Sequence, residues 1–219
     1  MSAFYRKVFA AAVVRPITTL WMGYALRHKE NLPVHGPAIV IANHNSHLDA
    51  LMLLSLFPQR LIPSIRIAAA ADYFFTNKTT RFLAEHVAGL VPVARTGSKA
   101  PLAPMAAVLE KGGILFLFPE GTRGSPDVMG DIKPGLWHIA RRFPEVPICP
   151  VYLHGLGRAM PKGSWVPVPL FADICVGEPF FVTTDKKGFP GQVKDIFDAL
   201  RVQTLAGLAA SGPDLDEEE

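Results

Sequence analysis

From residue 35 onward, short apolar runs alternate with longer segments of helical periodicity, and this constrains the fold more than any other feature of the sequence. Six of the runs are short enough and apolar enough to be buried strands: residues 37–43, 65–70, 90–94, 114–118, 148–153 and 172–177. Helices are expected over about 47–57, 73–88, 101–111, 134–142 and 191–209. This alternation predicts a single α/β domain, in which helices flank a central mixed sheet that is mostly parallel.

The composition divides the chain into three parts. Its 219 residues, 49% of them hydrophobic, suffice for one sizeable core, so we expect one domain over residues 35–211. Residues 1–34 are predicted to be an amphipathic, membrane-associated helical segment, and residues 212–219 an acidic, disordered tail. The tail holds five acidic residues and no basic ones, which leaves 22 basic against 14 acidic residues, a formal charge of +8, in the rest of the chain. A basic body favours anionic partners.

Residues 8–26 are apolar, but Arg15 and Pro16 interrupt them, so we do not expect a membrane span. No small-residue cleavage site follows, so a cleaved signal peptide is not expected either. Large apolar side chains are mixed here with basic residues that an interfacial helix uses against anionic headgroups: Arg6, Lys7, Arg15, Arg27 and Lys29. The alternative is an amphipathic pair of helices that closes the core. A nucleic-acid partner is not expected, because the sequence contains no aromatic-basic binding motif.

Polar clusters follow four of the predicted strands. They are "NHNSHLD" at residues 43–49, Arg95, "PEGTR" at residues 119–123, and the pair His154 and Gly155. In α/β sheets, ligands gather outside the carboxyl ends of the strands. Four polar clusters at such ends therefore indicate one shared pocket.

The stretch "PEGTR" suits the binding of an oxyanion. Gly121 permits a tight turn with exposed backbone N–H groups, and Arg123 supplies a guanidinium. The alternative is an ordinary turn that carries a surface pair of Glu120 and Arg123. On these five residues alone the two interpretations are balanced, and Arg95 by itself is typical of a solvated surface residue.

The stretch "NHNSHLD" combines a helix start with candidate catalytic groups. Ser46 and Asp49 have the spacing of a capping box in front of an apolar run. With Ser46 as N-cap, Asp49 would be the third helical residue, and its side chain would point back to His44 in the preceding turn. The helix start therefore predicts a His44–Asp49 pair. His47, expected at the first helical position, is interpreted as a structural or substrate-lining residue.

Two other chemistries were weighed for the same stretch. A serine hydrolase that uses Ser46 would need a Gly-x-Ser-x-Gly elbow, which the sequence lacks. A metal site at His44 and His47 would need a third ligand at a suitable spacing, and none is evident, so we expect no metal. Cys149 and Cys175 indicate free thiols in a reducing compartment.

Taken together, these motifs resemble those of the glycerophospholipid acyltransferase family, which includes the 1-acyl-sn-glycerol-3-phosphate acyltransferases. The blocks that carry the resemblance are "NHNSHLD" (43–49), "GLVPVAR" (89–95), "FPEGTR" (118–123) and "VPICPVYLHG" (146–155). They occur in the family's order and spacing and cover about residues 37–180. The first block is similar to the family's motif of a histidine, four residues and an aspartate.

The resemblance implies transfer of a fatty acyl group from acyl-CoA or acyl-acyl-carrier-protein to a hydroxyl of a lysophospholipid, first of all 1-acyl-glycerol-3-phosphate. No cofactor is implied beyond the thioester co-substrate. A glycerol hydroxyl needs a base in order to attack a thioester near neutral pH, and a histidine suits that task. His44 is then the expected general base and Asp49 the residue that orients it.

The acceptor's phosphate would be held by residues after neighbouring strands: Arg95, Glu120, Gly121, Thr122 and Arg123. Asn43, a turn-former, and Lys133, at a helix start that favours anions, are additional candidates. The expected location is the cytoplasmic face of a membrane, as a peripheral or monotopic protein. The alternative is a catalytically inactive peripheral lipid-binding protein of the same fold.

Overall fold

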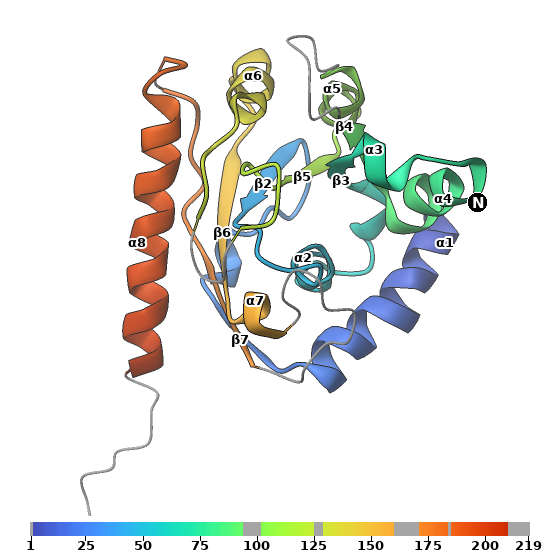
Figure 1. The fold of residues 1–219 in the computed structure, drawn as a ribbon, viewed down its shortest axis with the longest axis horizontal. Coiled ribbons are helices and arrows are strands. Elements are labelled where there is room, and N and C mark those ends of the chain that lie inside the picture. Colours follow the sequence, from blue (N-terminus) through green and yellow to red (C-terminus); the bar gives the residue numbers. More distant parts are fainter. Residues whose placement is uncertain (1, 94–101, 125–128, 160–170, 184, 210–219) are drawn as a thin grey trace, which may run out of the picture.

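The computed structural model describes residues 2–93, 102–124, 129–159, 171–183 and 185–209. Its sheet has the strand order β1-β7-β6-β2-β5-β3-β4 (Figure 1). The strands are β1 Tyr24–Arg27, β2 Ala38–Ala42, β3 Ile65–Ala70, β4 Leu90–Val93, β5 Ile114–Leu117, β6 Ile148–His154 and β7 Ala172–Val176. Neighbouring strands pair in parallel, except that β6 and β7 are antiparallel. The predicted α/β fold with a mostly parallel mixed sheet is confirmed.

Strand β1 was not predicted. It lies within residues 1–34, for which a helical segment was expected, and it pairs with β7 at the edge of the sheet. All four of its residues, Tyr-Ala-Leu-Arg, are only partly buried. Neither face of the strand is fully covered, and its sequence shows no alternation of apolar and polar residues. Long-range contacts hold it instead: Arg27 Nη2 lies 3.5 Å from Asp173 Oδ1 in β7.

Most helices follow the predicted ranges: α2 Asp49–Ser55, α3 Ala71–Phe74, α4 Lys78–Phe82, η5 Leu83–Ala88, α5 Ala103–Glu110, α6 Pro134–Arg142 and α8 Phe189–Ala209. The short helix α7 Leu156–Ala159 follows β6 and was not predicted. The helix expected over 73–88 is broken between α3 and α4. The cause is a capping box at Asn77, whose Oδ1 accepts from the Thr80 N–H at 2.9 Å while the Thr80 hydroxyl accepts from the Asn77 N–H.

The N-terminal residues form one helical stretch rather than a pair of helices. It comprises α1 Ser2–Phe9, the π-helical η1 Ala10–Val14 and the π-helical η2 Pro16–Trp21. Pro16 has no N–H that could donate within the helical stretch. The carbonyl oxygen of Arg15, the residue before it, accepts from the hydroxyls of Thr18 and Thr19 at 3.3 and 2.6 Å. Within the described residues, no helix is long and apolar enough to cross a membrane.

One face of this stretch packs on the domain and the other is exposed. Arg6, Ala10, Val14 and Thr18, four residues apart, are each 2% exposed or less. Phe4, Val8 and Leu20 expose 67%, 45% and 86% of their surface. The segment is therefore amphipathic, with large apolar side chains on its outer face as well as on its inner one.

Two of the basic residues expected to face headgroups do not do so. The buried Arg6 guanidinium donates from Nη1 to the Pro63 carbonyl oxygen at 2.7 Å and from Nη2 to the Ile65 carbonyl oxygen. Arg27, besides its contact with Asp173, donates to carbonyl oxygens of α8. Composition alone could not tell them from Lys7 and Arg15, which are exposed.

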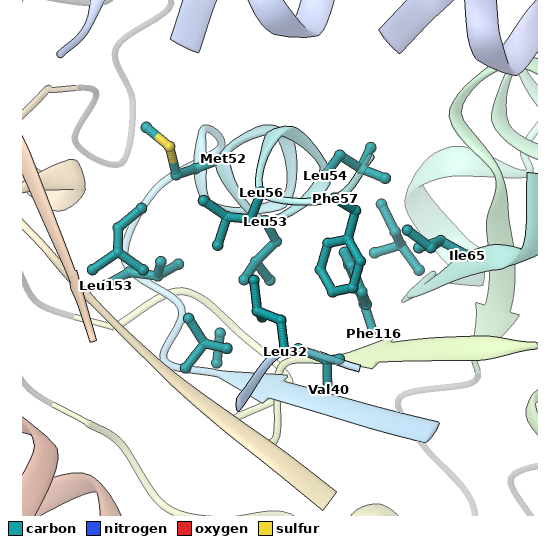
Figure 2. Packing of buried hydrophobic residues seen from close by; sticks show 14 of the residues in the cluster. Leu32, Val40, Met52, Leu53, Leu54, Leu56, Phe57, Ile65, Phe116 and Leu153 are labelled. Atoms are coloured by element: carbon teal, nitrogen blue, oxygen red, sulfur yellow. The ribbon is translucent and has the colours of Figure 1, made fainter. Parts of the chain in front are cut away.

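The sheet is covered on both faces. On one face, α2 and the N-terminal stretch pack over a cluster that includes Val40, Leu53 and Phe116, and Figure 2 shows these side chains between α2 and the strands. On the other face lie α5, α6 and α8, over a cluster that includes Ile39 and Ile41. The five residues of β2 are buried and their side chains alternate between the two clusters. This central strand delivers residue 43 to the carboxyl edge of the sheet.

Candidate active site

The carboxyl ends of β2 and β5 bring residues 43–49 together with residues 118–124. The two strands pair in parallel, so the segments that follow them leave the sheet at the same edge. The His44 N–H donates to Glu120 Oε1 at 2.8 Å, and the Gly124 N–H donates to the His44 carbonyl oxygen at 2.8 Å. The backbone of His44 is thus held from both sides by the segment after β5.

The predicted contact between His44 and Asp49 is present: Nδ1 lies 2.9 Å from Oδ2. The same Oδ2 accepts from the N–H groups of Asn45 at 2.7 Å and of Ser46 at 2.8 Å. Asp49 is 1% exposed, whereas the His44 side chain is 21% exposed. Because a carboxylate only accepts, Nδ1 carries the proton, and Nε2 is left as the acceptor that a general base needs.

The His44 imidazole also stacks on Phe118, with the ring centroids 4.1 Å apart and the planes inclined by 21°. Phe118 follows β5 directly and opens the block "FPEGTR". The stacking and the Asp49 hydrogen bond together fix the plane of the imidazole.

The helix start differs from the capping box that was predicted. Helix α2 begins at Asp49, and its N-cap is Leu48, which makes no side-chain cap bond. The Ser46 hydroxyl accepts from the Leu48 N–H at 3.2 Å, and the Asp49 N–H donates to the Ser46 carbonyl oxygen at 3.4 Å. A tight turn therefore precedes the helix, and the helix starts two residues later than predicted. The Asp49 carboxylate still accepts from the Ser46 N–H, so the pairing with His44 survives. Ser46 is fully buried, which gives a Ser46 hydrolase no support.

Glu120 is buried and faces backbone groups. Its Oε1 accepts from the His44 N–H and its Oε2 from the Gly130 N–H, both at 2.8 Å, and only 2% of the residue is exposed. Burial raises the pKa of the Glu120 carboxyl, and the two N–H donors offset part of that rise. Sequence reasoning placed Glu120 in the phosphate site and did not foresee these contacts, because their donors are backbone groups 76 and 10 residues away.

The rest of the "EGTR" turn is open. Gly121 adopts a positive φ of 69°, and Gly121 and Thr122 are exposed. Lys133 lies over this turn, since its Cγ would be 3.3 Å from a Cβ at Gly121, and its N–H donates to the Pro119 carbonyl oxygen at 2.8 Å. Lys133 therefore lies next to the turn that carries Gly121.

Arg123 carries a donor without a partner in the described part of the chain. Its Nη1 is buried and makes no hydrogen bond to any described residue. Burial and then the charges of Arg123 and His44 lower the pKa of His47. The N–H of Gly124, the next residue after Arg123, donates to the His44 carbonyl oxygen, which brings the Arg123 backbone close to the proposed base. An orphaned guanidinium N–H beside a histidine suits an anionic substrate group. Arg95, the other predicted arginine, lies outside the described residues.

Asn43 is buried and extends the pairing of β2 with β6. Its Nδ2 donates to the Leu153 carbonyl oxygen at 2.8 Å, and its Oδ1 accepts from the Leu153 N–H at 2.8 Å. Nδ2 also donates to Asn45 Oδ1 at 2.7 Å. Asn43 therefore fixes the chain immediately before His44, a task more specific than the turn-former expected. Among the described residues, no three His, Cys, Asp or Glu side chains gather as a metal site requires.

Several known proteins are similar to this chain. It is 34% identical over 145 residues to the chloroplastic 1-acyl-sn-glycerol-3-phosphate acyltransferase BAT2 of Brassica napus, a match that covers 62% of this chain and 38% of that protein. It is 28% identical over 132 residues to the mouse 1-acyl-sn-glycerol-3-phosphate acyltransferase alpha, which covers 58% of this chain and 44% of that protein. The chain thus spans less than half the length of these relatives.

The fold also matches a solved structure. The crystal structure of PlsC, the 1-acyl-sn-glycerophosphate acyltransferase of Thermotoga maritima, superposes with a TM-score of 0.70 at 21% identity and covers 93% of this chain and 79% of that one. The family model described as Acyltransferase matches residues 24–154, which is more than half of the 219 residues. The chain therefore belongs to the acyltransferase family.

Proposed function

We propose that this chain transfers a fatty acyl group from acyl-CoA or acyl-acyl-carrier-protein to a hydroxyl of a lysophospholipid, with 1-acyl-glycerol-3-phosphate as the first acceptor to test. The observation that carries this proposal is the His44–Asp49 pair at 2.9 Å, with a partly exposed imidazole. The segment after β5 that binds the His44 backbone also carries Arg123, whose Nη1 has no partner among the described residues. The names of the similar proteins support the choice of acceptor.

In the proposed reaction, His44 Nε2 removes the proton from the acceptor hydroxyl as its oxygen attacks the thioester carbonyl carbon. An oxygen–carbon bond forms, the carbon–sulfur bond breaks, and the leaving thiolate takes the proton from the His44 imidazolium. Asp49 stabilises that imidazolium through Nδ1 and keeps the ring in the required tautomer. Both substrates react in one ternary complex, without an acyl-enzyme and without a cofactor or metal.

The acceptor's phosphate is proposed to lie at the "EGTR" turn. Arg123 is the main ligand, supported by the backbone N–H of Thr122 and by Lys133. Gly121 shapes the turn through its positive φ, while its own N–H donates to the Phe118 carbonyl oxygen at 3.0 Å. Arg95 is included in this proposal on the basis of the sequence.

The proposed partner of the N-terminal stretch is a membrane surface on the cytoplasmic side. Its outer face presents Phe4, Val8 and Leu20 together with the exposed Lys7 and Arg15, as interfacial helices do. In this arrangement the inner face closes the core while the outer face meets lipid, so the two alternatives weighed from sequence are compatible.

A thiol-release assay with one acyl-CoA and a panel of lysolipids tests the proposed activity. Release of CoA that depends on 1-acyl-glycerol-3-phosphate, and is weaker with phosphate-free monoacylglycerol, is expected. No release with any acceptor from either donor, with binding to anionic liposomes retained, would contradict the enzyme and favour a lipid-binding protein of this fold.

A further inference from the structure

We infer that Glu120 is a positioning residue, whose carboxylate fixes the backbone of His44 relative to the segment that carries Arg123, and that it does not bind the acceptor's phosphate. This inference rests on the proposed acyl transfer for its kinetic consequences. Its structural basis lies in contacts that are independent of the reaction.

The first argument is that both carboxylate oxygens already have partners. Oε1 accepts from the His44 N–H and Oε2 from the Gly130 N–H, each at 2.8 Å. Only 2% of Glu120 is exposed, so substrate has almost no access to the side chain. A carboxylate beside a phosphate would also repel it, since both are anions. The two backbone N–H groups that Glu120 binds therefore explain its buried position.

The segment after β5 contacts the His44 backbone at two points, one on each side of Arg123 in the sequence. Glu120 binds the N–H of His44, and Gly124 donates to the carbonyl oxygen of the same residue. Arg123 lies between these two contact points in sequence. The hydrogen bonds that hold the proposed base thus also set its distance from the proposed phosphate ligand.

The third argument is the close approach at Gly130. A Cβ at this position would lie 2.9 Å from Glu120 Oε2, closer than side chains normally pack. A glycine here lets the backbone N–H reach the carboxylate. Glu120 therefore joins three segments at this edge of the sheet: the turn after β2, the turn after β5, and the stretch that leads to Lys133 and α6.

Glu120→Gln separates positioning from phosphate binding. The substitution keeps the size of the side chain but turns one acceptor into an NH₂ donor that faces a backbone N–H. We expect kcat to fall about 10²-fold, because small displacements of a base are that costly, with KM for 1-acyl-glycerol-3-phosphate changed by less than about threefold. The same fall in kcat is expected with monoacylglycerol as acceptor. An unchanged kcat, or a rise in KM confined to phosphate-bearing acceptors, would overturn the inference.

Gly130→Ala displaces the carboxylate from the opposite side without changing any charge. It should lower kcat in the same way but less, and wild-type kinetics in this variant would contradict the link between Gly130 and His44. The matched control is Glu145→Gln, which removes an exposed carboxylate and should leave kcat and KM unchanged.

Hydrogen exchange at the His44 amide tests the contact without catalysis. In the full chain, Glu120→Gln and Gly130→Ala should speed exchange at His44 while the amides of β7 exchange as in wild type. Unaltered protection at His44 in both variants would overturn the inference. If wild type transfers no acyl group but His44 is deprotected in the variants, the proposed function fails and the positioning contact stands.

Discussion

The turn at His44 and the N-terminal helical stretch both depend on buried charged side chains that bind backbone groups, but with opposite polarity. In the turn, the carboxylates of Asp49 and Glu120 accept from N–H groups. In the helix, the guanidinium of Arg6 donates to the carbonyl oxygens of Pro63 and Ile65. The carboxylates orient a partly exposed histidine, whereas the guanidinium attaches one whole element to the domain. A buried charged side chain therefore indicates a reactive site only where the group that it orients is accessible to substrate.

The largest effect is expected from Asp49→Asn, which removes the carboxylate that orients His44 in the turn. The amide matches the carboxylate in size but carries no negative charge, so it no longer stabilises the His44 imidazolium that forms in the reaction. We expect kcat in the thiol-release assay to fall about 10³- to 10⁴-fold with the thermal midpoint little changed. Asp195→Asn, an exposed control in α8, should behave as wild type. Near wild-type turnover in Asp49→Asn would refute the orienting role.

Arg6→Met removes the guanidinium that attaches the N-terminal helical stretch to the domain. The carbonyl groups of Pro63, half-buried, and Ile65, buried, lose their donors. Hydrogen bonds to charged groups contribute about 1.5–3 kcal/mol each, and the loss is partly offset because the buried Arg6 Nε has no partner among the described residues. We expect the free energy of unfolding in a denaturant titration to fall by about 2–4 kcal/mol. Lys7→Met, on the exposed side of the same helix, should change it by less than about 0.5 kcal/mol. Equal effects of the two substitutions would show that Arg6 does not dock the helix.

Arg123→Ala is expected to act on substrate rather than on the turn. Loss of a charge-assisted contact should raise KM for 1-acyl-glycerol-3-phosphate about 10- to 100-fold and leave KM for monoacylglycerol nearly unchanged. The control is Arg141→Ala, an exposed arginine of α6. Equal losses with both acceptors would contradict phosphate binding by Arg123.

The smallest effect on the fold is expected from Phe4→Ser combined with Leu20→Ser on the outer face of the helix. Both side chains are exposed, so the free energy of unfolding should change by less than about 1 kcal/mol. Co-sedimentation with anionic liposomes should nevertheless weaken several-fold. Undiminished sedimentation would mean that the outer face is not the membrane surface.

The buried thiol of Cys149 serves as a probe of unfolding. Burial raises the pKa of Cys149 in β6 to about 12, and its Sγ donates to the Asn31 carbonyl oxygen at 3.3 Å. The thiol stays protonated below that pH, so at pH 8 only about one molecule in 10⁴ carries the reactive thiolate. Cys149 should therefore resist alkylation in native wild type and react once the chain unfolds. Rapid alkylation of native wild type at pH 8 would contradict the burial.

The sequence predicted the interior of the sheet well, because its strands are short apolar runs that the core must bury. Strand β1 was missed because its residues are only half-buried and its partner β7 is far away in sequence. The pairing of His44 with Asp49 was predicted correctly from the local sequence, although from a helix start that lies two residues before the observed one. The roles of Arg6 and Glu120 were not, since both bind backbone groups that only the tertiary fold brings near. The parts played by residues 1–34, 212–219 and Arg95 stay predictions.

His44→Ala in the thiol-release assay tests the central claim most directly. The variant loses the proposed base while Asp49 keeps the Asn45 and Ser46 N–H donors that hold the turn. Loss of at least about 10³-fold in acceptor-dependent thiol release, with the thermal midpoint and the sheet unchanged, is the predicted result. Acyl transfer at a rate close to that of wild type would contradict the assignment of His44 as the base.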